Sequence, residues 1–361
     1  MSKLHAVIMA GGSGTRFWPA SRRNRPKQLL PIAGGVPMIE ATIARVLPLC
    51  DRDHVWIVTN KAQKKQIARL LLDFPVEQIL VEPEPRDTAP CIAFATATIA
   101  AADPDATIVV LPADHVIEPL DAFVSMLRRG VALCDERTLV TFGVQPTFAA
   151  TGYGYLELGA AIDAGAPGAA AVRSFREKPD EATARGFLAA GNFRWNSGIF
   201  AFRATAMRAA MAAKAPELAE ATDRMLDALR ADNARALTAA FKRAPKISID
   251  YAVMEKAAHL VAVDCTAHWD DVGSFPALAR VLPADQSGNH LSLHQGAEAV
   301  ALEAGDNVVY AEGKRTVALF GVDGLVVCAV GDAVLVCKKE RADDLKRLVN
   351  ELTERGRQDL L

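Results

Sequence analysis

Residues 9–28 read MAGGSGTRFWPASRRNRPKQ and follow directly on the apolar run Leu4–Met9, LHAVIM. The run predicts a buried strand, and the stretch after it brings three glycines and then five basic residues within twelve positions. Glycines let backbone N–H groups approach an anion closely, while Arg and Lys side chains supply full positive charges. The stretch therefore predicts an α/β fold with a phosphate-binding loop after its first strand.

Two well-known glycine-rich loops do not fit this stretch. A P-loop would end in Gly-Lys-Ser/Thr, which is absent. A dinucleotide fingerprint needs a third glycine where Phe17 stands, and its acidic partner would have to be Glu40, which lies in an expected helix. What remains is a bare backbone that approaches a triphosphate, with Arg16 and Lys27 as its cations.

The other arginines of the stretch have a simpler interpretation. Arg22, Arg23 and Arg25 lie in a polar, turn-forming segment between two prolines. We expect them to be solvated on a surface turn rather than to contact a ligand.

The stretch closely resembles the signature G-G-x-G-x-R-L-x-P, followed by P-K, of the sugar-1-phosphate nucleotidyltransferases. Its W-P-x-S-R and P-K-Q elements resemble the mannose-1-phosphate guanylyltransferase branch (GDP-mannose pyrophosphorylase), and Phe17 stands where leucine is usual. The resemblance implies that Arg16 and Lys27 are catalytic. It also implies that the loop binds a nucleotide through Ala10, Gly11, Gly12, Gly14, Thr15 and Arg16.

Apolar runs that read as strands alternate with helical patterns in the first half of the chain. The runs cover residues 4–9, 55–59, 79–81, 107–111 and 139–144. This alternation predicts a Rossmann-like, mostly parallel mixed sheet flanked by helices, in a catalytic domain of residues 1–284.

The end of the chain has a different pattern. A polar, turn-rich segment at residues 283–296 is interpreted as the linker. Short β-type runs and a charged helix at about residues 341–353 follow it. We expect residues 285–361 to form a small β-rich domain, a partial left-handed β-helix. The chain is expected to be the short form of the family, without the isomerase domain of some relatives.

Aspartates after expected strands are candidate metal ligands. Asp114 lies in VVLPADHVI, and Asp270 and Asp271 lie in HWDDVGSF. From the residues alone, a metal site and a helix cap or turn are about equally good interpretations of Asp114. Resemblance to the family's motifs implies that Asp114 and Asp271 ligate Mg²⁺. His290 and His294 are expected to be solvated in the linker.

The segment EPEPRDTAP at residues 82–90 resembles the family's E-P-x-x-R-N-T-A-P loop. That resemblance implies nucleotide contacts by Glu82, Arg86, Asp87 and Thr88. Asp87 replaces the usual asparagine, and because ionised Asp only accepts hydrogen bonds, the identity of the base stays open. A helix cap is the alternative role for Asp87.

Three further segments resemble the family's sugar-phosphate half: TGYGYLE, FREKP and WNSGIF. They imply contacts by Gly154, Tyr155, Glu177, Lys178 and Asn196. Asp250, in SIDYAVMEK, is interpreted as a helix-capping residue.

Composition limits the classes of function. The 361 residues carry 41 basic and 43 acidic side chains, a net charge of −2, which argues against sequence-independent nucleic-acid binding. No run approaches the ~20 apolar residues of a membrane span. The six cysteines are scattered without a C-x-x-C pair, as is typical of a reduced, cytoplasmic protein. The β-rich domain is a possible homodimer contact.

Together, the motifs predict Mg²⁺-assisted transfer of GMP from GTP to mannose 1-phosphate, by in-line attack of the sugar phosphate on the α-phosphorus. Another sugar 1-phosphate or nucleoside triphosphate is an open alternative. So is a catalytically silent subunit that binds sugar nucleotides, although such a subunit could dispense with the metal ligands. A Rossmann oxidoreductase is a third alternative, and the failed fingerprint argues against it.

Overall fold

The computed structural model describes residues 3–12, 14–162 and 167–361. Its main sheet is nine-stranded, in the order β3-β2-β1-β4-β9-β6-β10-β8-β7. The strands are β1 (Leu4–Met9), β2 (Val55–Asn60), β3 (Ile79–Glu82), β4 (Thr107–Pro112), β6 (Leu139–Val144), β7 (Tyr155–Ala161), β8 (Ala169–Arg176), β9 (Phe193–Arg203) and β10 (Leu260–Asp264).

The sheet is mixed, as predicted. Strands β3, β2, β1 and β4 run parallel, and β9 lies antiparallel between β4 and β6. The five runs interpreted as strands all form strands within one residue of their expected ends. Because parallel strands are covered on both faces, these runs are almost continuously apolar.

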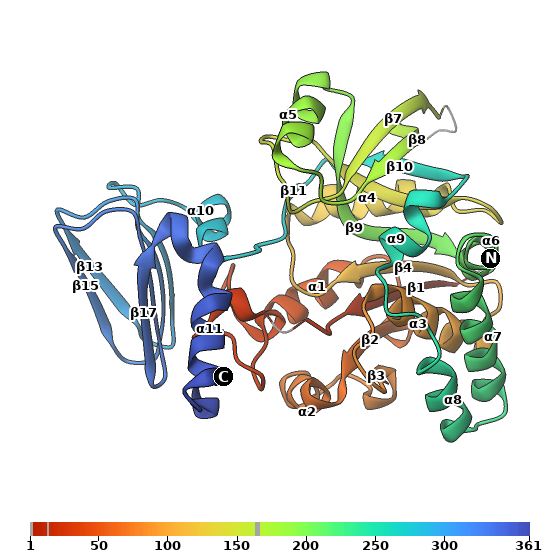
Figure 1. Cartoon of the computed structure of the whole chain (residues 1–361), viewed down its shortest axis with the longest axis horizontal. Coiled ribbons are helices and arrows are strands. Elements are labelled where there is room, and N and C mark those ends of the chain that lie inside the picture. Colours follow the sequence, from red (N-terminus) through yellow and green to blue (C-terminus); the bar gives the residue numbers. More distant parts are fainter. Residues whose placement is uncertain (1–2, 13, 163–166) are drawn as a thin grey trace.

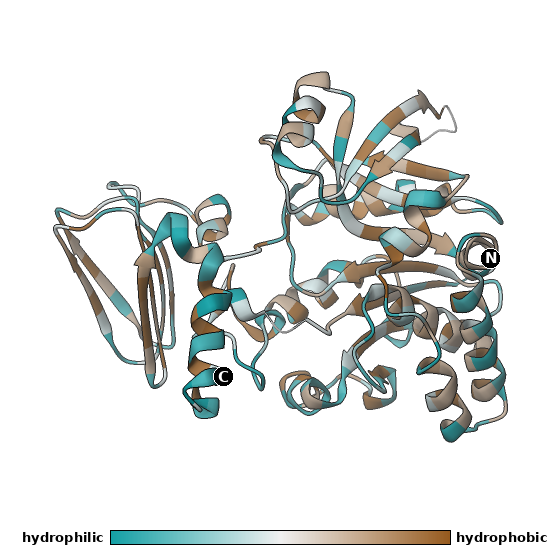
Figure 2. Ribbon diagram, in the orientation of Figure 1, coloured by the Kyte–Doolittle hydropathy of each residue, from teal (hydrophilic) through white to brown (hydrophobic). Residues whose placement is uncertain are grey.

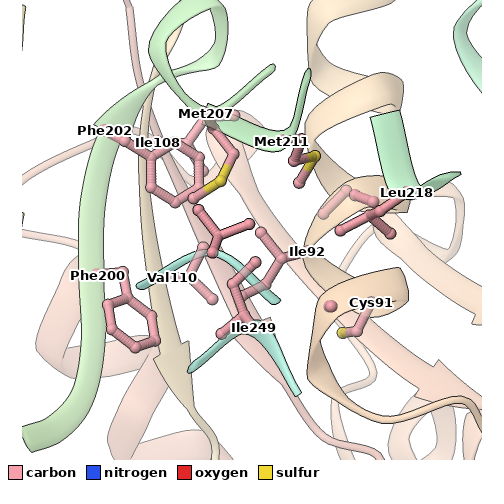
Figure 3. Packing of buried hydrophobic residues seen from close by; sticks show 14 of the residues in the cluster. Cys91, Ile92, Ile108, Val110, Phe200, Phe202, Met207, Met211, Leu218 and Ile249 are labelled. Carbon is pink, nitrogen blue, oxygen red and sulfur yellow. The ribbon is translucent and has the colours of Figure 1, made fainter. Parts of the chain in front are cut away.

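Helices cover both faces of the sheet (Figure 1). One apolar layer lies under α1 (Met38–Val46) and α4 (Leu120–Ala132), and the other under α3 (Thr88–Ala102), α6 (Ala204–Lys214) and α7 (Pro216–Arg230). Figure 3 shows the second layer, where Phe202 and Ile108 lie beside Met207. The remaining helices are α2 (Lys61–Leu70), α5 (Glu181–Ala190), α8 (Ala234–Phe241), α9 (Ile249–Ala252), α10 (Leu278–Val281) and α11 (Leu345–Glu354).

The order of the strands reverses between β1 and β4, because the chain goes from β1 outward to β2 and β3 and then returns on the other side. Met9 and Pro112 pair in register at the carboxyl ends of these two strands. Open α/β sheets bind ligands in the crevice at such a switch point. The register therefore brings the glycine loop beside the loop that carries Asp114.

The C-terminal strands form a coil with parallel pairing, except that the last strand pairs antiparallel with the strand before it. These are β12 (His290–His294), β13 (Glu298–Leu302), β14 (Val308–Glu312), β15 (Thr316–Phe320), β16 (Leu325–Val330) and β17 (Ala333–Lys338). His290 pairs with Val308, and Val308 with Val326, so each rung is 18 residues further along the chain. Asn307 Nδ2 donates to Asn289 Oδ1 at 2.9 Å and continues the stacking at the corner of the coil. This is the architecture of a β-helix, and we call residues 290–361, the coil together with α11 and the end of the chain, the β-helix unit.

Two boundary predictions for this region need correction. Strand β12 lies inside the segment interpreted as a linker, because Leu291 and Leu293 alternate with polar residues that dominate a composition count. The terminal helix is preceded by a 3₁₀ turn at Lys339–Asp344, and α11 begins only at Leu345. In Figure 2, α11 is mostly teal with narrow brown bands, as expected for a helix with one apolar side. Within the described residues, no helix combines the length and the hydropathy needed to cross a bilayer.

Candidate active site

Side chains from outside the glycine loop satisfy its carbonyl groups. Ala10 O accepts hydrogen bonds from Gln28 Nε2 and Thr59 Oγ1, both at 2.9 Å. Gly12 O accepts from Gln63 Nε2 at 3.0 Å. An anion that enters the loop therefore meets neither of these oxygens as a free acceptor. The two glutamines were missed from the sequence, although Gln28 lies in the P-K-Q element that carried part of the resemblance.

Gly14 allows two ends of the signature stretch to meet. Its φ is +62°, and a Cβ there would lie 2.7 Å from Lys27 Cβ and 2.9 Å from Lys27 N. Any larger residue would separate the 3₁₀ turn Thr15–Phe17, which carries Arg16, from the turn Lys27–Leu29. The turns that carry Arg16 and Lys27 thus lie together because position 14 has no side chain.

Lys27 is buried and bridges two loops. Its Nζ donates to Asp114 Oδ2 at 2.9 Å and to the carbonyl oxygen of Asp271 at 2.6 Å. Burial disfavours the ionised form of Asp114, but the Lys27 ammonium outweighs this and holds the pKa of the Asp114 carboxyl below its ordinary value. A third of the Asp114 side chain remains exposed, at 36%.

The neighbouring acids Asp270 and Asp271 have different environments. Both lie at the end of the ribbon formed by β5 (Val116–Glu118) and β11 (His268–Asp270). Asp270 is 5% exposed; it pairs with Arg280, whose Nη2 lies 3.0 Å from Oδ1, and accepts from Val272 N. Asp271 Oδ1 instead accepts from Tyr153 Oη at 2.7 Å, and Tyr153 and Asp271 both line the cavity described below.

The side chains of Arg16 and Asp271 both lie close to Gly273. A Cβ on Gly273 would lie 3.4 Å from Arg16 Nη1 and 3.1 Å from Asp271 Oδ2. The guanidinium and the carboxylate are therefore grouped around one glycine, and Arg16 is exposed to solvent.

Asp114 and Asp271 are the residues that could hold a metal ion. Among residues 3–12, 14–162 and 167–361, no cluster of three or more His, Cys, Asp or Glu side chains has metal-binding geometry. Mg²⁺ does not require one, because it usually takes one or two carboxylates and completes its shell with phosphate and water oxygens. The donor set thus fits a cation that arrives with a triphosphate. His115 is held differently: its Nδ1 accepts from Trp269 Nε1 at 3.1 Å.

A cleft of about 620 Å³, measured to its open mouth, adjoins Asp271. Glu177, Asn196 and Asp250 form its polar wall. Asn196 Nδ2 donates to Asp250 Oδ1 at 3.1 Å, and a Cβ on Gly154 would lie 2.5 Å from Glu177 Oε2. The cleft is lined by Met9, Thr88, Pro112, His115, Gly152, Tyr153, Gly154, Glu177, Asn196, Ser197, Gly198, Phe200, Ile249, Asp250, Trp269 and Asp271.

The interpretation of Asp250 as a cap is wrong. The cap of α9 is Ser248, whose Oγ accepts from Tyr251 N. Asp250 lies further on, in the wall of the cleft, where burial and then the Glu177 carboxylate raise its pKa to about 7. In the sequence, Asp250 is recognisable only as a residue near a helix start, and no local pattern indicates that it lies in the wall of the cleft.

Lys178 and Tyr155 differ in exposure: Lys178 is mostly exposed, and Tyr155 is buried. Lys178 Nζ lies 3.0 Å from Glu177 Oε1, with a side chain 60% exposed. Tyr155 does not line the cleft. Its side chain is 0% exposed and packs against Phe187. Side chains alternate between the two faces along strand β7, so Tyr155 and its neighbour Leu156 enter different apolar clusters of the core. Its predicted sugar contact is therefore corrected.

The segment expected to bind the base lies at the end of β3. Glu82 is 8% exposed, its Oε2 lies 3.5 Å from a Cβ built on Gly11, and Oε1 is buried without a hydrogen-bond partner in the described part of the chain. Burial, and to a lesser extent Asp87, raises the pKa of Glu82 to about 7. An isolated buried acceptor beside the glycine loop suits a ligand with hydrogen-bond donors.

The other members of this segment make local bonds. Asp87 has φ +72° and caps α3 by accepting from Thr88 N at 2.7 Å. Thr88 Oγ1 accepts from Ile249 N at 2.9 Å, and Arg86 Nη1 donates to the carbonyl of Ala244 at 2.7 Å. Arg86 thus holds this loop against the segment that follows α8.

Two of the arginines expected to be solvated are paired. Arg22 forms an ion pair with Asp332, and Arg25 with Glu312, both on the β-helix unit. The expectation failed because their partners lie some 300 residues away in the sequence, at separations of 310 and 287.

Comparison with known proteins agrees with this geometry. The nucleotidyl transferase family profile matches residues 5–288, and the MannoseP isomerase/GMP-like beta-helix domain profile matches residues 297–352. The xanthan biosynthesis protein XanB of Xanthomonas campestris pv. campestris (strain B100) is 39% identical over 99% of this chain and 75% of its own length. A mannose-1-phosphate guanylyltransferase of Klebsiella pneumoniae is 37% identical over the same shares.

A solved structure is similar over nearly the whole chain. It is described as a mannose-1-phosphate geranyltransferase from Thermus thermophilus, with a TM-score of 0.87 and 34% identity over 97% of this chain and 99% of that one. Because the family profile covers most of the chain and these relatives match both of its parts, the chain belongs to the nucleotidyltransferase family and carries that family's β-helix domain.

Proposed function

We propose that the protein transfers GMP from GTP to mannose 1-phosphate, forming GDP-mannose and pyrophosphate. The observation that carries this proposal is a single cleft at the β1/β4 switch point. Asp271 lines this cleft together with a polar wall of Glu177, Asn196 and Asp250. Arg16, Lys27 and Asp114 are grouped beside Asp271, next to the cleft. Relatives that match 99% of the chain bear the name mannose-1-phosphate guanylyltransferase, which supports the choice of substrates.

The proposed reaction needs no general base. A phosphate oxygen of mannose 1-phosphate, already ionised at neutral pH, attacks the α-phosphorus of GTP. The new bond joins this oxygen to phosphorus, and the bond to the oxygen that bridges to the β-phosphate breaks, with its electron pair leaving on pyrophosphate. Catalysis then depends on aligning two polyanions and stabilising their charge. Arg16 and Lys27 would hold the leaving pyrophosphate.

Nucleotidyltransferases of this family generally use a divalent metal. We propose Mg²⁺, held by Asp114 and Asp271. When bound, it would neutralise phosphate charge and polarise the phosphoryl oxygens. Tyr153 would fix the orientation of the Asp271 carboxylate, because its hydroxyl donates to Oδ1.

The polar wall would bind the sugar phosphate. Glu177 and Asp250 are acceptors, and Asn196 both donates and accepts, which suits a ring of hydroxyl groups. Lys178, which is mostly exposed and pairs with Glu177, would meet the attacking phosphate. Gly154 would keep the wall open, because a side chain there would displace Glu177.

Glu82 supports guanine as the base. Guanine presents N1–H and N2–H₂ donors on one edge, and the buried carboxylate beside Gly11 is an acceptor with an unused oxygen. In this proposal Asp87, Thr88 and Arg86 shape the loop that holds the nucleotide, and Gly12, Thr15 and their neighbours approach its phosphates.

Further parts of the proposal concern the whole protein. We propose that residues 1–284 form the catalytic domain and residues 285–361 the β-rich domain. We also propose a cytoplasmic location, consistent with six free cysteines, three of them buried. A homodimer stays a prediction that sedimentation equilibrium would test.

The deciding experiment measures pyrophosphate release in a pyrophosphatase-coupled assay. Each of four nucleoside triphosphates is crossed with mannose 1-phosphate and glucose 1-phosphate in the presence of Mg²⁺. Turnover concentrated on GTP with mannose 1-phosphate supports the assignment. A different best pair would replace the substrates and keep the chemistry, whereas no turnover from folded protein would favour a sugar-nucleotide-binding regulatory subunit.

A further inference from the structure

We propose that Glu312 of the β-helix unit positions Lys27 through Arg25, so that this unit is a working part of the nucleotide site. The inference rests on the proposed function for the identity of the nucleotide. Glu312 is a positioning residue in this proposal, since it touches Arg25 and not the substrate.

The contact between the two parts of the chain is a bidentate ion pair between the partly exposed Arg25 and the buried Glu312. Arg25 Nη1 lies 2.6 Å from Glu312 Oε2, and Nη2 lies 2.8 Å from Oε1. The Glu312 side chain is only 6% exposed, and the fully buried Tyr310 donates its hydroxyl to Glu312 as well. Bidentate pairs of this kind fix the orientation of a guanidinium as well as its position.

A short, stiff segment connects this pair to the active-site ammonium. Arg22 and Arg25 exchange two backbone hydrogen bonds of 2.9 Å, which closes a tight turn. Pro26 follows, with its φ restricted by the ring, and Lys27 then begins its 3₁₀ turn. Only Pro26 separates the anchored arginine from the lysine that contacts Asp114.

The other half of the stretch lies on the same unit. Trp18 Nε1 donates to the carbonyl of Leu360 at 2.8 Å, and Phe17 and Trp18 belong to one apolar cluster with Tyr310 and Leu345. Figure 1 shows the red N-terminal segment lying against the blue helix α11. The segment between Arg16 and Lys27 therefore contacts the β-helix unit at several points, through Phe17, Trp18, Arg22 and Arg25. The two cations at its ends lie beside Asp271.

This arrangement predicts which substrate loses affinity when the pair is removed. The nucleotide side of the cleft depends on Lys27, whereas the sugar side is formed by Glu177, Asn196 and Asp250 from the main-sheet domain. A merely structural pair would lower stability and affect both substrates alike. A positioning pair would weaken triphosphate binding selectively.

Two variants separate these possibilities. Glu312→Gln keeps the shape and removes the charge. The triple variant R25M/Y310F/E312M removes all three polar partners together, and such replacement of a buried pair by apolar residues often retains stability. Asp332→Asn is the matched control: it breaks the Arg22 pair on the same turn, but Asp332 is 61% exposed, so little change is expected.

Three quantities are measured on the full chain: the dissociation constant of GTP by calorimetry, the KM of mannose 1-phosphate, and acetylation of Lys27 by mass spectrometry relative to the half-buried Lys64. Both Glu312 variants should weaken GTP about tenfold, which is the size of one charged hydrogen bond. The KM of mannose 1-phosphate should change less than about twofold, and Lys27 should be acetylated faster than in the wild type.

Unchanged GTP affinity and unchanged Lys27 acetylation in a triple variant that melts like the wild type would overturn the inference, as would equal losses for both substrates. Failure of the wild type to use GTP with mannose 1-phosphate would instead overturn the proposed function. The Lys27 acetylation rate would still decide whether the β-helix unit positions this lysine.

Discussion

Lys27 Nζ lies 2.9 Å from Asp114 Oδ2, although the two residues are 87 positions apart in the chain. They meet because the loops after β1 and β4 leave neighbouring parallel strands at the same edge of the sheet. The contact pairs the proposed triphosphate cation with a proposed metal ligand. A triphosphate with its metal would therefore replace an existing charge pair rather than enter an uncompensated site.

Replacing Lys27 with Met should abolish most turnover, by at least about a hundredfold, as expected for loss of one group that stabilises developing charge. The variant should also change the pH dependence of stability. The pKa of Asp114 is held below its ordinary value of about 3.9, so the pair stabilises the fold above pH ~4 and loses this effect as the pH falls through the lower folded pKa. Urea unfolding should show a wild-type advantage at pH 7 that shrinks toward pH 3. An advantage of equal size at both pH values would contradict the assignment.

Gly14→Ala and Gly12→Ala should both impair the protein, the first by destabilising the fold and the second by weakening GTP binding alone. At Gly14, φ is +62° and a Cβ would meet the Lys27 backbone, so we expect a loss of about 1–3 kcal/mol in the free energy of unfolding together with lost activity. At Gly12 nothing lies within 4 Å of a Cβ, so folding should be unaffected. If a triphosphate approaches this backbone, Gly12→Ala should nevertheless weaken GTP binding. Calorimetry and thermal melts on both variants test this, and normal GTP affinity in Gly12→Ala would remove Gly12 from the site.

The adjacent acids should separate catalysis from stability. Asp271→Asn should lower turnover at least tenfold with every substrate and raise the Mg²⁺ concentration needed for half-maximal rate, with a nearly unchanged melting temperature. Asp270→Asn breaks the ion pair of the buried Asp270 with Arg280, whose side chain is 40% exposed, and should destabilise the fold by about 1–3 kcal/mol. The two variants serve as controls for each other, in a Mg²⁺ titration and in urea unfolding. Full activity of Asp271→Asn would show that the metal assignment is wrong.

Much of the fold could be predicted because strands buried on both faces leave an unmistakable apolar run. The helical patterns expected between these runs are also present, and α1 and α4 bury periodic apolar residues such as Ile39 and Phe123. The 18-residue repeat of the β-helix unit was missed, although Asn289 and Asn307 mark it, because short strands with polar corners resemble a linker in composition.

The sequence indicated candidate site residues only where they lie in local motifs. Arg16 and Lys27 belong to one stretch, but nothing near Arg25 in the sequence announces Glu312. The same holds for Asp250, which lines the cleft and contacts Asn196, a residue 54 positions away in the sequence. Tyr155 is the opposite case: it lies within a motif that resembles the family's sugar-binding segment, yet its side chain is buried in the core.

For Asp250 we expect that the carboxylate favours substrate binding but lowers the stability of the fold at neutral and higher pH. Burial and then Glu177 raise its pKa to about 7, so the folded protein resists an ionisation that the unfolded chain undergoes near pH 4. The stability linked to this group is therefore fully present below pH ~4 and is lost as the pH rises through about 7. Asp250→Asn removes the titration and can still accept from Asn196, so at pH 8 it should be more stable than the wild type by about 1–2 kcal/mol. Urea unfolding at pH 8 and pH 4.5 checks this, with the difference closing at the lower pH.

The same substitution should impair the reaction. An amide cannot match a carboxylate as an acceptor of sugar hydroxyls, so the KM of mannose 1-phosphate should rise about tenfold in Asp250→Asn, while GTP affinity stays close to that of the wild type. Asp180→Asn is a suitable control, because Asp180 caps α5 and Asn caps equally well. If Asp250 were only a capping residue, its variant would resemble this control at every pH and with both substrates. A stabilised variant with a weakened sugar site would instead show that Asp250 is kept for binding at the expense of stability.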